Sequence, residues 1–266
     1  MEKPWLHPVP EYYARLNAYI LEVGLPWSLK DMHNCEGNAS ELRKTLDLIA
    51  GQTVLDCSCG WGTQAIPLAW LGCRVTACDV SETSMEMARK YAEKMGVQVD
   101  FRVCDLRELD QAFHQQFDWV VSCFALYEIQ TDEEIRQAIS GMFQALKLGG
   151  KCYIALRNKD SLMQDKDRHQ FHGETRYDHG RVICVEDWDY ESETHVIALH
   201  AFLREDERYA PSEWGRWTTE TIGVRKRALR KAELEHMLLE AGFNPVYFIP
   251  QVGPWMPTEV IATRSE

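Results

Sequence analysis

The sequence has no apolar run long enough to cross a membrane and no excess of positive charge. No stretch approaches 18 apolar residues, and the first residues, MEKPWLHPVPEYY, lack the apolar core of a signal peptide. We therefore expect a cytoplasmic protein with no membrane partner. The net charge of −12 argues against a nucleic-acid partner, because a groove that follows phosphates needs a basic face. We interpret the one basic cluster, at 225–231, as a solvated surface.

The cysteines follow neither a disulfide framework nor a metal-binding pattern. Nine is an odd number, and most of them lie inside predicted strands, which is typical of reduced, small apolar residues. Cys57 and Cys59 form a C-x-C with Cys73 and Cys78 nearby, but no supporting ligand pair occurs elsewhere in the sequence. We expect no metal.

The chain is organised around residues 53–72, TVLDCSCGWGTQAIPLAWLG. A short β-prone run ends on Asp56, Gly60 and Gly62 follow, and apolar residues at helical spacing begin at Ala65. A doubly wound sheet uses this order of strand, glycine turn and helix to present a nucleotide to a helix N-terminus. Glycine lets the backbone approach a ligand where a side chain would collide.

Two ligand classes fit this turn. Gly60, Gly62 and Ala65 satisfy the dinucleotide pattern G-x-G-x-x-A, but the carboxylate of Asp56 would repel a pyrophosphate and attract a cationic amino acid. The pattern D-x-x-x-G-x-G instead resembles class I S-adenosylmethionine-dependent methyltransferases, with Ser58 where that family usually has its first glycine. The resemblance implies that the turn lies against the methionine part and the ribose of the cofactor.

Two further acids follow predicted strands. Asp79 stands 19 residues after Gly60, the spacing at which a carboxylate reaches ribose hydroxyls. Asp105 ends the third strand, where the resemblance implies a contact with the exocyclic amine of adenine. The residues expected to bind S-adenosylmethionine, or its product S-adenosylhomocysteine, are Asp56, Ser58, Gly60, Gly62, Asp79, Val80, Cys104, Asp105, Leu106, Cys123 and Phe124.

The segment after the fourth strand should form the floor of the site. FDWVVSCFALYEI, which starts at Phe117, matches the family pattern F-D-x-V-x-x. Reacting groups lie at strand ends in such sheets, so residues 124–128 are expected there, with Tyr127 as a candidate catalytic residue. Thr131 and Glu134 predict a capping box for the next helix.

The layout predicts an α/β fold with a doubly wound, mostly parallel seven-stranded sheet, the Rossmann-like methyltransferase fold. At 266 residues and 45% hydrophobic content the chain can bury a full core. Alternating segments at 181–190 and 194–203, joined by a short polar turn, predict an antiparallel β insertion after the fifth strand. The expected parts are 1–50, an N-terminal helical extension or lid; 51–160, a cofactor-binding core; 161–228, a β insertion that caps the substrate; and 229–266, the last helix and strands.

The flanking segments are less regular. Helices are expected at 15–23 and at 41–49, the second capped by Ser40, and a polar loop containing three histidines is expected at 169–179. The aromatic residues of the N-terminal extension either cover the edge of the core or close over the substrate. The candidates for substrate contact are Tyr12, Tyr13 and Trp27.

The tail resembles one branch of the family, the glycine and sarcosine N-methyltransferases. The branch motif R-N-Y-D is matched at 157–160 except that Lys159 replaces tyrosine, and RALRKAELEHMLLEAGF follows as in the branch. There the arginine holds the substrate carboxylate, so Arg157 is a candidate catalytic and substrate-binding residue and Asn158 a substrate-binding one. A structural salt bridge between Arg157 and Asp160 is the alternative.

These features predict methyl transfer to a small-molecule substrate. The methyl group on sulfonium is already activated, so the protein has mainly to position an amine of an amino acid or metabolite for in-line attack. Three alternatives stay open: an O-methyltransferase of a small carboxylate or phenol, an NAD-type oxidoreductase, and a non-catalytic cofactor-binding subunit. The sequence is compatible with a homo-oligomer.

Overall fold

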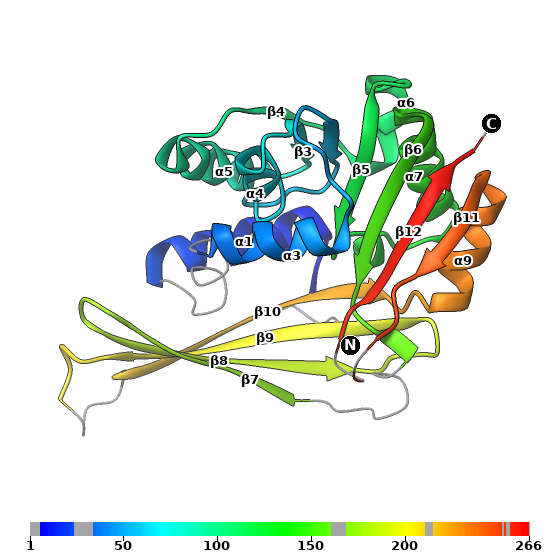
Figure 1. The fold of residues 1–266 in the computed structure, drawn as a ribbon. Coiled ribbons are helices and arrows are strands. Elements are labelled where there is room, and N and C mark those ends of the chain that lie inside the picture. The colour runs from blue at the N-terminus through cyan, green and yellow to red at the C-terminus, as the bar shows by residue number, and fades with distance from the viewer. Residues whose placement is uncertain are drawn as a thin grey trace. The chain divides into compact units, whose positions relative to one another are not determined.

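The computed structural model describes residues 6–23, 34–160, 169–210, 215–251, 253 and 256–265. The chain forms two compact units (Figure 1). We call Asn34–Gln164 with Arg227–Glu266 the core unit, and Met1–His33 with Asp165–Lys226 the insertion unit. The four-part division expected from the sequence stays a prediction.

The core unit contains the predicted seven-stranded sheet, with the strand order β11-β12-β6-β5-β2-β3-β4. Neighbouring strands from β6 to β4 are parallel, whereas β12 runs antiparallel to β6 and β11 antiparallel to β12. The doubly wound, mostly parallel architecture is thereby confirmed. The strands are β2 (Thr53–Asp56), β3 (Arg74–Asp79), β4 (Val99–Val103), β5 (Phe117–Cys123), β6 (Leu146–Leu156), β11 (Phe243–Phe248) and β12 (Thr258–Arg264).

Helices cover both faces of this sheet, as Figure 1 shows. Along β5, Val120 packs into the core formed with α6, α7 and α9, and Val121 into the core formed with α3, α4 and α5. Burial on both faces explains why the strands read as nearly continuous apolar runs. The helices are α3 (Cys35–Thr45), α4 (Ala65–Trp70), α5 (Glu82–Met95), α6 (Leu109–Ala112), α7 (Asp132–Ala145) and α9 (Lys231–Glu240), with short 3-10 turns η1 (Leu106–Glu108) and η2 (Leu126–Glu128).

Local caps fix where two of these helices begin. Ser81 accepts a hydrogen bond from the backbone N–H of Ser84 at the start of α5. At α7, Thr131 accepts from the backbone N–H of Glu134 and donates to its carboxylate. The predicted N-cap at Thr131 is confirmed, but Glu134 pairs with the Thr131 hydroxyl and not with its backbone N–H as in the predicted capping box.

The insertion unit is a five-stranded sheet with the order β1-β10-β9-β8-β7 and one described helix, α1 (Val9–Val23). The hairpin predicted from alternation is present, with β8 antiparallel to β9 and Glu186 directly opposite His200. Tyr19 of α1 stacks on Phe202 of β9 with 4.2 Å between ring centroids. The strands are β1 (Leu6–His7), β7 (His169–Tyr177), β8 (Gly180–Asp189), β9 (His195–Asp206) and β10 (Trp217–Arg227).

Three local predictions were wrong. Residues 169–177 form β7, not a loop, because an edge strand needs backbone pairing on one side and tolerates polar side chains. Helix α3 begins at Cys35, so Ser40 lies inside it, and its buried residues Cys35, Ala39 and Leu42 follow helical spacing. Helix α1 begins at Val9, earlier than expected, because Pro10 in the first turn removes an N–H that has no helical partner.

Within the described ranges, no helix combines the length and the apolar character that a bilayer crossing needs.

Candidate functional site

The candidate site lies at the carboxyl ends of the parallel strands in the core unit. The chain winds from β2 outward to β3 and β4, and then returns to place β5 on the other side of β2. Doubly wound sheets bind ligands at this point of reversal, outside the carboxyl ends of the strands. Asp56 is the last residue of β2 and Asp79 the last of β3, so both acids lie at this edge.

The glycine turn leaves space beside the backbone. Gly60 and Gly62 have positive φ angles of 51° and 84°. A Cβ on Gly62 would lie 2.7 Å from Cδ1 of Ile66, whereas one on Gly60 would have no protein atom within 4 Å. The conformation at both positions favours glycine, and the open side of Gly60 is available to a ligand.

Asp79 ties this turn to the next helix. Its carboxylate accepts one hydrogen bond from the N–H of Gly60 and one from the N–H of Ser81, each at 2.9 Å. Burial raises the pKa of Asp79, and these N–H groups offset part of the rise. Each carboxylate oxygen keeps a further lone pair, so Asp79 can still accept from a ribose hydroxyl.

Asp56 is a buried acid with an unsatisfied oxygen. Only 1% of the residue is exposed; Oδ1 accepts from the N–H of Ser58 at 3.4 Å, and no described residue donates a hydrogen bond to Oδ2. Burial raises the pKa of Asp56 to about 7, the N–H groups of Ser58 and Ala65 lower it, and the charge of Asp79 raises it. A cationic ligand would compensate this buried carboxylate.

Asp105 differs from the other two acids because Arg107 donates hydrogen bonds to both of its carboxylate oxygens. The backbone N–H and Nε of Arg107 donate to Oδ1, at 2.8 and 3.0 Å, and Nη2 donates to Oδ2 at 2.7 Å. This pairing lowers the pKa of Asp105. Asp105 therefore caps η1, and its contact with adenine stays a prediction.

The other expected cofactor residues surround these acids. Leu106 is buried in the core and Val80 is exposed. The thiol of Cys104 is half-buried, and a hydrogen bond from Cys78 lowers its pKa. Desolvation raises the pKa of Cys123, the last residue of β5.

The end of β5 carries a strained residue. Phe124 has a φ angle of +58°, its side chain is exposed, and its N–H donates to the carbonyl oxygen of Ala155 on β6 at 2.8 Å. An aromatic residue in this region of φ is uncommon, and such strain concentrates at functional sites. The hydroxyls of Ser58 and Ser122 lie 3.2 Å apart and join β5 to the glycine turn.

The segments after β5 and β6 meet at the same edge. Tyr127 in η2 is buried, and the Nζ atom of Lys159 lies 5.5 Å from its ring centroid. Asn158 donates to Oε1 of Gln251 at 3.2 Å, and Arg157 is half-buried. Asp160 accepts from the N–H of Lys231 at the start of α9. The roles expected for Tyr127, Arg157 and Asn158 stay predictions.

The aromatic substrate candidates belong to the insertion unit. Tyr12 and Tyr13 form an edge-to-face pair in α1 with 4.9 Å between ring centroids, and Tyr12 is 1% exposed. Trp27 lies outside the described residues. The sequence did not predict that the Tyr12 hydroxyl lies 3.0 Å from Nδ1 of His200, whose Nε2 is 3.7 Å from the buried Glu186. Cross-strand pairing of Glu186 with His200 produces this cluster.

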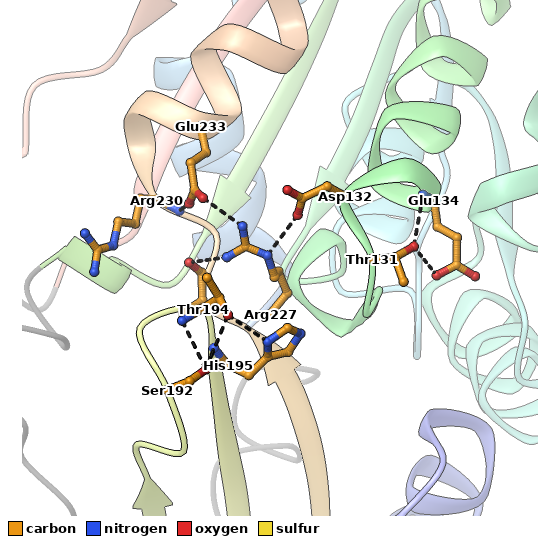
Figure 2. A network of polar contacts seen from close by, with 10 residues as sticks. Thr131, Asp132, Glu134, Ser192, Thr194, His195, Arg227, Arg230 and Glu233 are labelled. Carbon is orange, nitrogen blue, oxygen red and sulfur yellow. Dashed lines mark hydrogen bonds and ion pairs between the residues drawn. The ribbon is translucent and has the colours of Figure 1, made fainter.

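Two of the basic residues at 225–231, Arg225 and Arg227, pair with acids of the protein itself. Arg225 donates to Glu191 at 2.7 Å in the insertion unit. In the core unit, Figure 2 shows the buried Arg227 between Asp132 of α7 and Glu233 of α9, to which it donates at 2.9 and 2.7 Å. The interpretation of the cluster as a solvated surface was wrong for Lys226 and Arg227, which are 5% and 4% exposed. The described part of the chain also contains no group of three potential metal ligands.

Sequence comparison relates the glycine-turn region to a known family. Residues 54–150 match the family described as a methyltransferase domain. A ubiquinone biosynthesis O-methyltransferase from Xanthomonas euvesicatoria pv. vesicatoria is 33% identical over 111 residues, 42% of this chain and 45% of the relative. One from Idiomarina loihiensis is 32% identical over 114 residues, 43% and 46% of the two chains. The chain thus matches less than half the length of these relatives.

Solved structures share the fold over most of the chain. CalS10, an amino pentose methyltransferase from Micromonospora echinaspora solved with S-adenosylmethionine bound, has a TM-score of 0.67 at 16% identity and covers 88% of this chain and 92% of its own. The sugar N-methyltransferase KedS8 from Streptoalloteichus has a TM-score of 0.66 at 15% identity over 87% of each chain. This likeness supports the fold predicted from the sequence.

Proposed function

We propose that this protein transfers a methyl group from S-adenosylmethionine to a small-molecule acceptor. The match of residues 54–150 to a methyltransferase domain family supports this proposal. The proposed acceptor atom is an amine nitrogen of an amino acid or another metabolite. The resemblance of 157–160 to the glycine and sarcosine branch supports a nitrogen acceptor, as does the structural neighbour KedS8, which is named as a sugar N-methyltransferase.

The residues at the carboxyl edge fit the cofactor. The unsatisfied Oδ2 of Asp56 suits a neighbouring cation, and the open side of Gly60 admits a ligand against the backbone. Asp79 would hold the ribose hydroxyls, and Cys104, Asp105 and Leu106 the adenine. The buried Asp56 at the end of β2 and the half-buried Asp79 at the end of β3 are the observation that carries this proposal.

In the proposed reaction, the main task of the protein is to position the acceptor and the cofactor. S-Adenosylmethionine, when bound, supplies a methyl group on a sulfonium that needs no further activation. Arg157 and Asn158 would orient the acceptor so that its lone pair points at the methyl carbon. Tyr127, in η2 after β5, would help exclude water. Tyr12, Tyr13 and Trp27 remain the proposed aromatic residues for substrate contact.

Oxygen methylation is the second candidate. The relatives with 30–34% identity are named ubiquinone biosynthesis O-methyltransferases, which favours a phenol-type acceptor. A panel of amines and phenols incubated with the cofactor and analysed by product mass spectrometry separates the two. Methylation of amines alone supports the first candidate, and methylation of phenols alone replaces it with the second.

Calorimetry with S-adenosylhomocysteine and with NAD tests the cofactor. We expect binding of S-adenosylhomocysteine and none of NAD. Tight binding of NAD alone would instead identify an oxidoreductase. Tight binding of S-adenosylhomocysteine without methylation of any acceptor would favour a non-catalytic cofactor-binding subunit.

A further inference from the structure

Glu259 is an acid at the carboxyl edge of the sheet in the core unit. It is the second residue of β12 and is half-buried. Its Oε1 atom accepts a hydrogen bond from the hydroxyl of Tyr153 on β6. Among the described residues, no group donates to Oε2, and no lysine, arginine or histidine forms an ion pair with Glu259. Oε2 can therefore accept a hydrogen bond from a ligand.

Strand pairing places Glu259 beside the end of β5, on the face of the sheet that carries Asp56. Glu259 is opposite Ala155 of β6, and Ala155 is opposite Cys123, the last residue of β5. Asp56 of β2 is opposite Val121, two residues before Cys123. Paired residues, and residues two apart on one strand, point to the same face, so Glu259, Cys123 and Asp56 share a face. In agreement, Val121 and Ala155 belong to one buried core.

The thiol of Cys123 lies close enough to both acids to be affected by their charges. Burial is the main cause of the raised pKa of Cys123, and the charges of Asp56 and Glu259 raise it further. Asp56 belongs to β2 on one side of β5, and Glu259 lies beyond β6 on the other side. A ligand over the end of β5 can therefore lie between the carboxylate assigned to the cofactor and a second carboxylate.

The charged residues of segments 124–130 and 157–160, after β5 and β6, already interact with the rest of the protein. They are Glu128, Arg157, Lys159 and Asp160. Glu259 differs from them because its one side-chain partner, Tyr153, is a neutral hydroxyl. Burial, the nearby Cys123 and the hydrogen bond with Glu259 raise the pKa of Tyr153. The phenol therefore stays protonated, and it orients the carboxylate without neutralising it.

Methyl transfer to a nitrogen moves positive charge onto the acceptor. The nitrogen gives its lone pair to the methyl carbon, the C–S bond breaks with its electrons left on sulfur, and the charge passes from the sulfonium to the new ammonium. A carboxylate beside the nitrogen stabilises this transition state more than it stabilises the neutral amine, and the difference accelerates the reaction. The same carboxylate repels a phenolate.

We propose that Glu259 selects amines over phenols as methyl acceptors, with Oε2 accepting a hydrogen bond from the N–H of the amine. This inference rests on the proposed function and names its acceptor class. The amine binds in its neutral form, and the ammonium product loses its proton to water after release. Tyr153 is a positioning residue, because it acts on the acceptor through the carboxylate that it holds.

The test compares acceptors that differ in the nucleophilic atom. Aniline with phenol and 4-aminobenzoate with 4-hydroxybenzoate are matched pairs, and glycine and sarcosine represent aliphatic amines. Methylation kinetics with product mass spectrometry measure kcat and KM, and calorimetry measures affinity for S-adenosylhomocysteine.

Three variants isolate the two side chains. Glu259→Gln removes the charge at nearly constant shape, Tyr153→Phe removes only the hydroxyl, and the double variant combines them. Glu93→Gln is the matched control, because Glu93 is an exposed glutamate of α5 in the same unit.

We expect wild type to methylate at least one of the amines and to prefer it over the phenols. Glu259→Gln should lower kcat for that amine about 10- to 100-fold, as for a lost hydrogen bond to a charged group, and should not lower phenol methylation. Tyr153→Phe should lower the same kcat about 3- to 10-fold and have no further effect in the Glu259→Gln background. Glu93→Gln should match wild type, and affinity for S-adenosylhomocysteine should be unchanged in every variant.

The inference alone fails if wild type is an active methyltransferase that prefers the phenols. It also fails if a Glu259→Gln variant with wild-type melting temperature keeps its amine kcat, or loses affinity for S-adenosylhomocysteine in parallel with kcat. Should Glu259→Gln not fold, an unchanged amine kcat in Tyr153→Phe overturns it. Failure of the proposed function looks different, because wild type would then methylate neither amines nor phenols, and the inference would fall with it.

Discussion

Gly60 and Gly96 have similar backbone conformations but different surroundings. Their φ angles are +51° and +67°, and a Cβ at either position would have no protein atom within 4 Å. Alanine at either position should therefore cost about 1–2 kcal/mol of stability from left-handed strain alone. Gly60→Ala should in addition lower affinity for S-adenosylhomocysteine at least about tenfold, because its methyl group would fill space assigned to the ligand.

Gly96→Ala is the control for that effect, because Gly96 caps α5. Urea unfolding measures the shared cost, and calorimetry measures cofactor affinity. Equal affinity in the two variants would mean that the open side of Gly60 is not part of the cofactor site.

Asp56 makes cofactor binding depend on pH. Burial raises its pKa to about 7, and a bound cation favours the ionised form. Affinity for S-adenosylmethionine should therefore fall as the pH drops below 7, approaching tenfold per pH unit. Calorimetry from pH 5.5 to 8 should show this decline in wild type and in Asp105→Asn, because Arg107 already holds the pKa of Asp105 low. Asp56→Asn should bind weakly at every pH.

The same residue should lower stability at high pH. A carboxyl whose folded-state pKa is raised stabilises the fold only while protonated, so this contribution is complete below about pH 4 and lost as the pH rises through about 7. Asp56→Asn should thus melt at a higher temperature than wild type at pH 8. If Asp56→Asn melted at a lower temperature than wild type at pH 8, burial would not raise the pKa of Asp56 in the folded protein.

Asp79 and Arg157 should affect different kinetic constants. Asp79→Ala removes the acceptor for the N–H groups of Gly60 and Ser81 and should weaken cofactor binding by about 1–3 kcal/mol. Arg157→Ala should raise the acceptor KM and leave cofactor affinity near that of wild type. Equal loss of cofactor binding in both variants would show that Arg157 does not serve the acceptor.

For single residues, the sequence predicted where the acids lie along the strands better than it predicted their side-chain contacts and burial. The acids at the ends of β2 and β3 could be placed because an acid after an apolar run marks a strand end. The pairing of Asp105 with Arg107 could not be predicted, because it depends on the side-chain conformation of Arg107. Nor could the burial of Lys159, since its neighbours in sequence are all polar or charged.

Among the elements, α7 and α9 are joined by two arginines of different burial. Arg227 is 4% exposed and donates to Asp132 and Glu233 (Figure 2), whereas the Arg136 pair with Glu240 is largely exposed. Arg227→Met should cost about 1–3 kcal/mol of unfolding free energy, because it breaks several hydrogen bonds of a buried guanidinium.

Arg136→Met should cost less than about 1 kcal/mol, because solvent screens an exposed pair. Urea unfolding of both variants makes the comparison, and equal costs would refute the role given to Arg227.

Elements were predictable where apolar periodicity was strong. The parallel strands and the β8–β9 hairpin were predicted from such runs. β7 was missed because its sequence, HQFHGETRY, is mostly polar and shows no apolar alternation. The strand forms through backbone pairing with β8, which the sequence pattern does not reveal. The start of α3 was missed because Cys35 and Gly37 are poor helix signals in isolation.

In the whole molecule, each of the two units is built from two segments that are separate in the sequence. The insertion unit combines an N-terminal segment with residues that follow β6, and the chain returns to the core unit at Arg227. The sequence indicated the insertion through a change from parallel-strand runs to alternating segments. It could not indicate that α1 packs in the insertion unit, because the Tyr12–His200 and Tyr19–Phe202 contacts join residues more than 180 positions apart.

A crystal structure of the protein with S-adenosylhomocysteine would show whether the carboxyl edge of the sheet binds the cofactor. We expect the ligand at the carboxyl ends of β2 and β3, with its amino acid part near Asp56 and its ribose on Asp79. This expectation would be contradicted by a ligand bound elsewhere, or by electron density in which both carboxylates face bulk water.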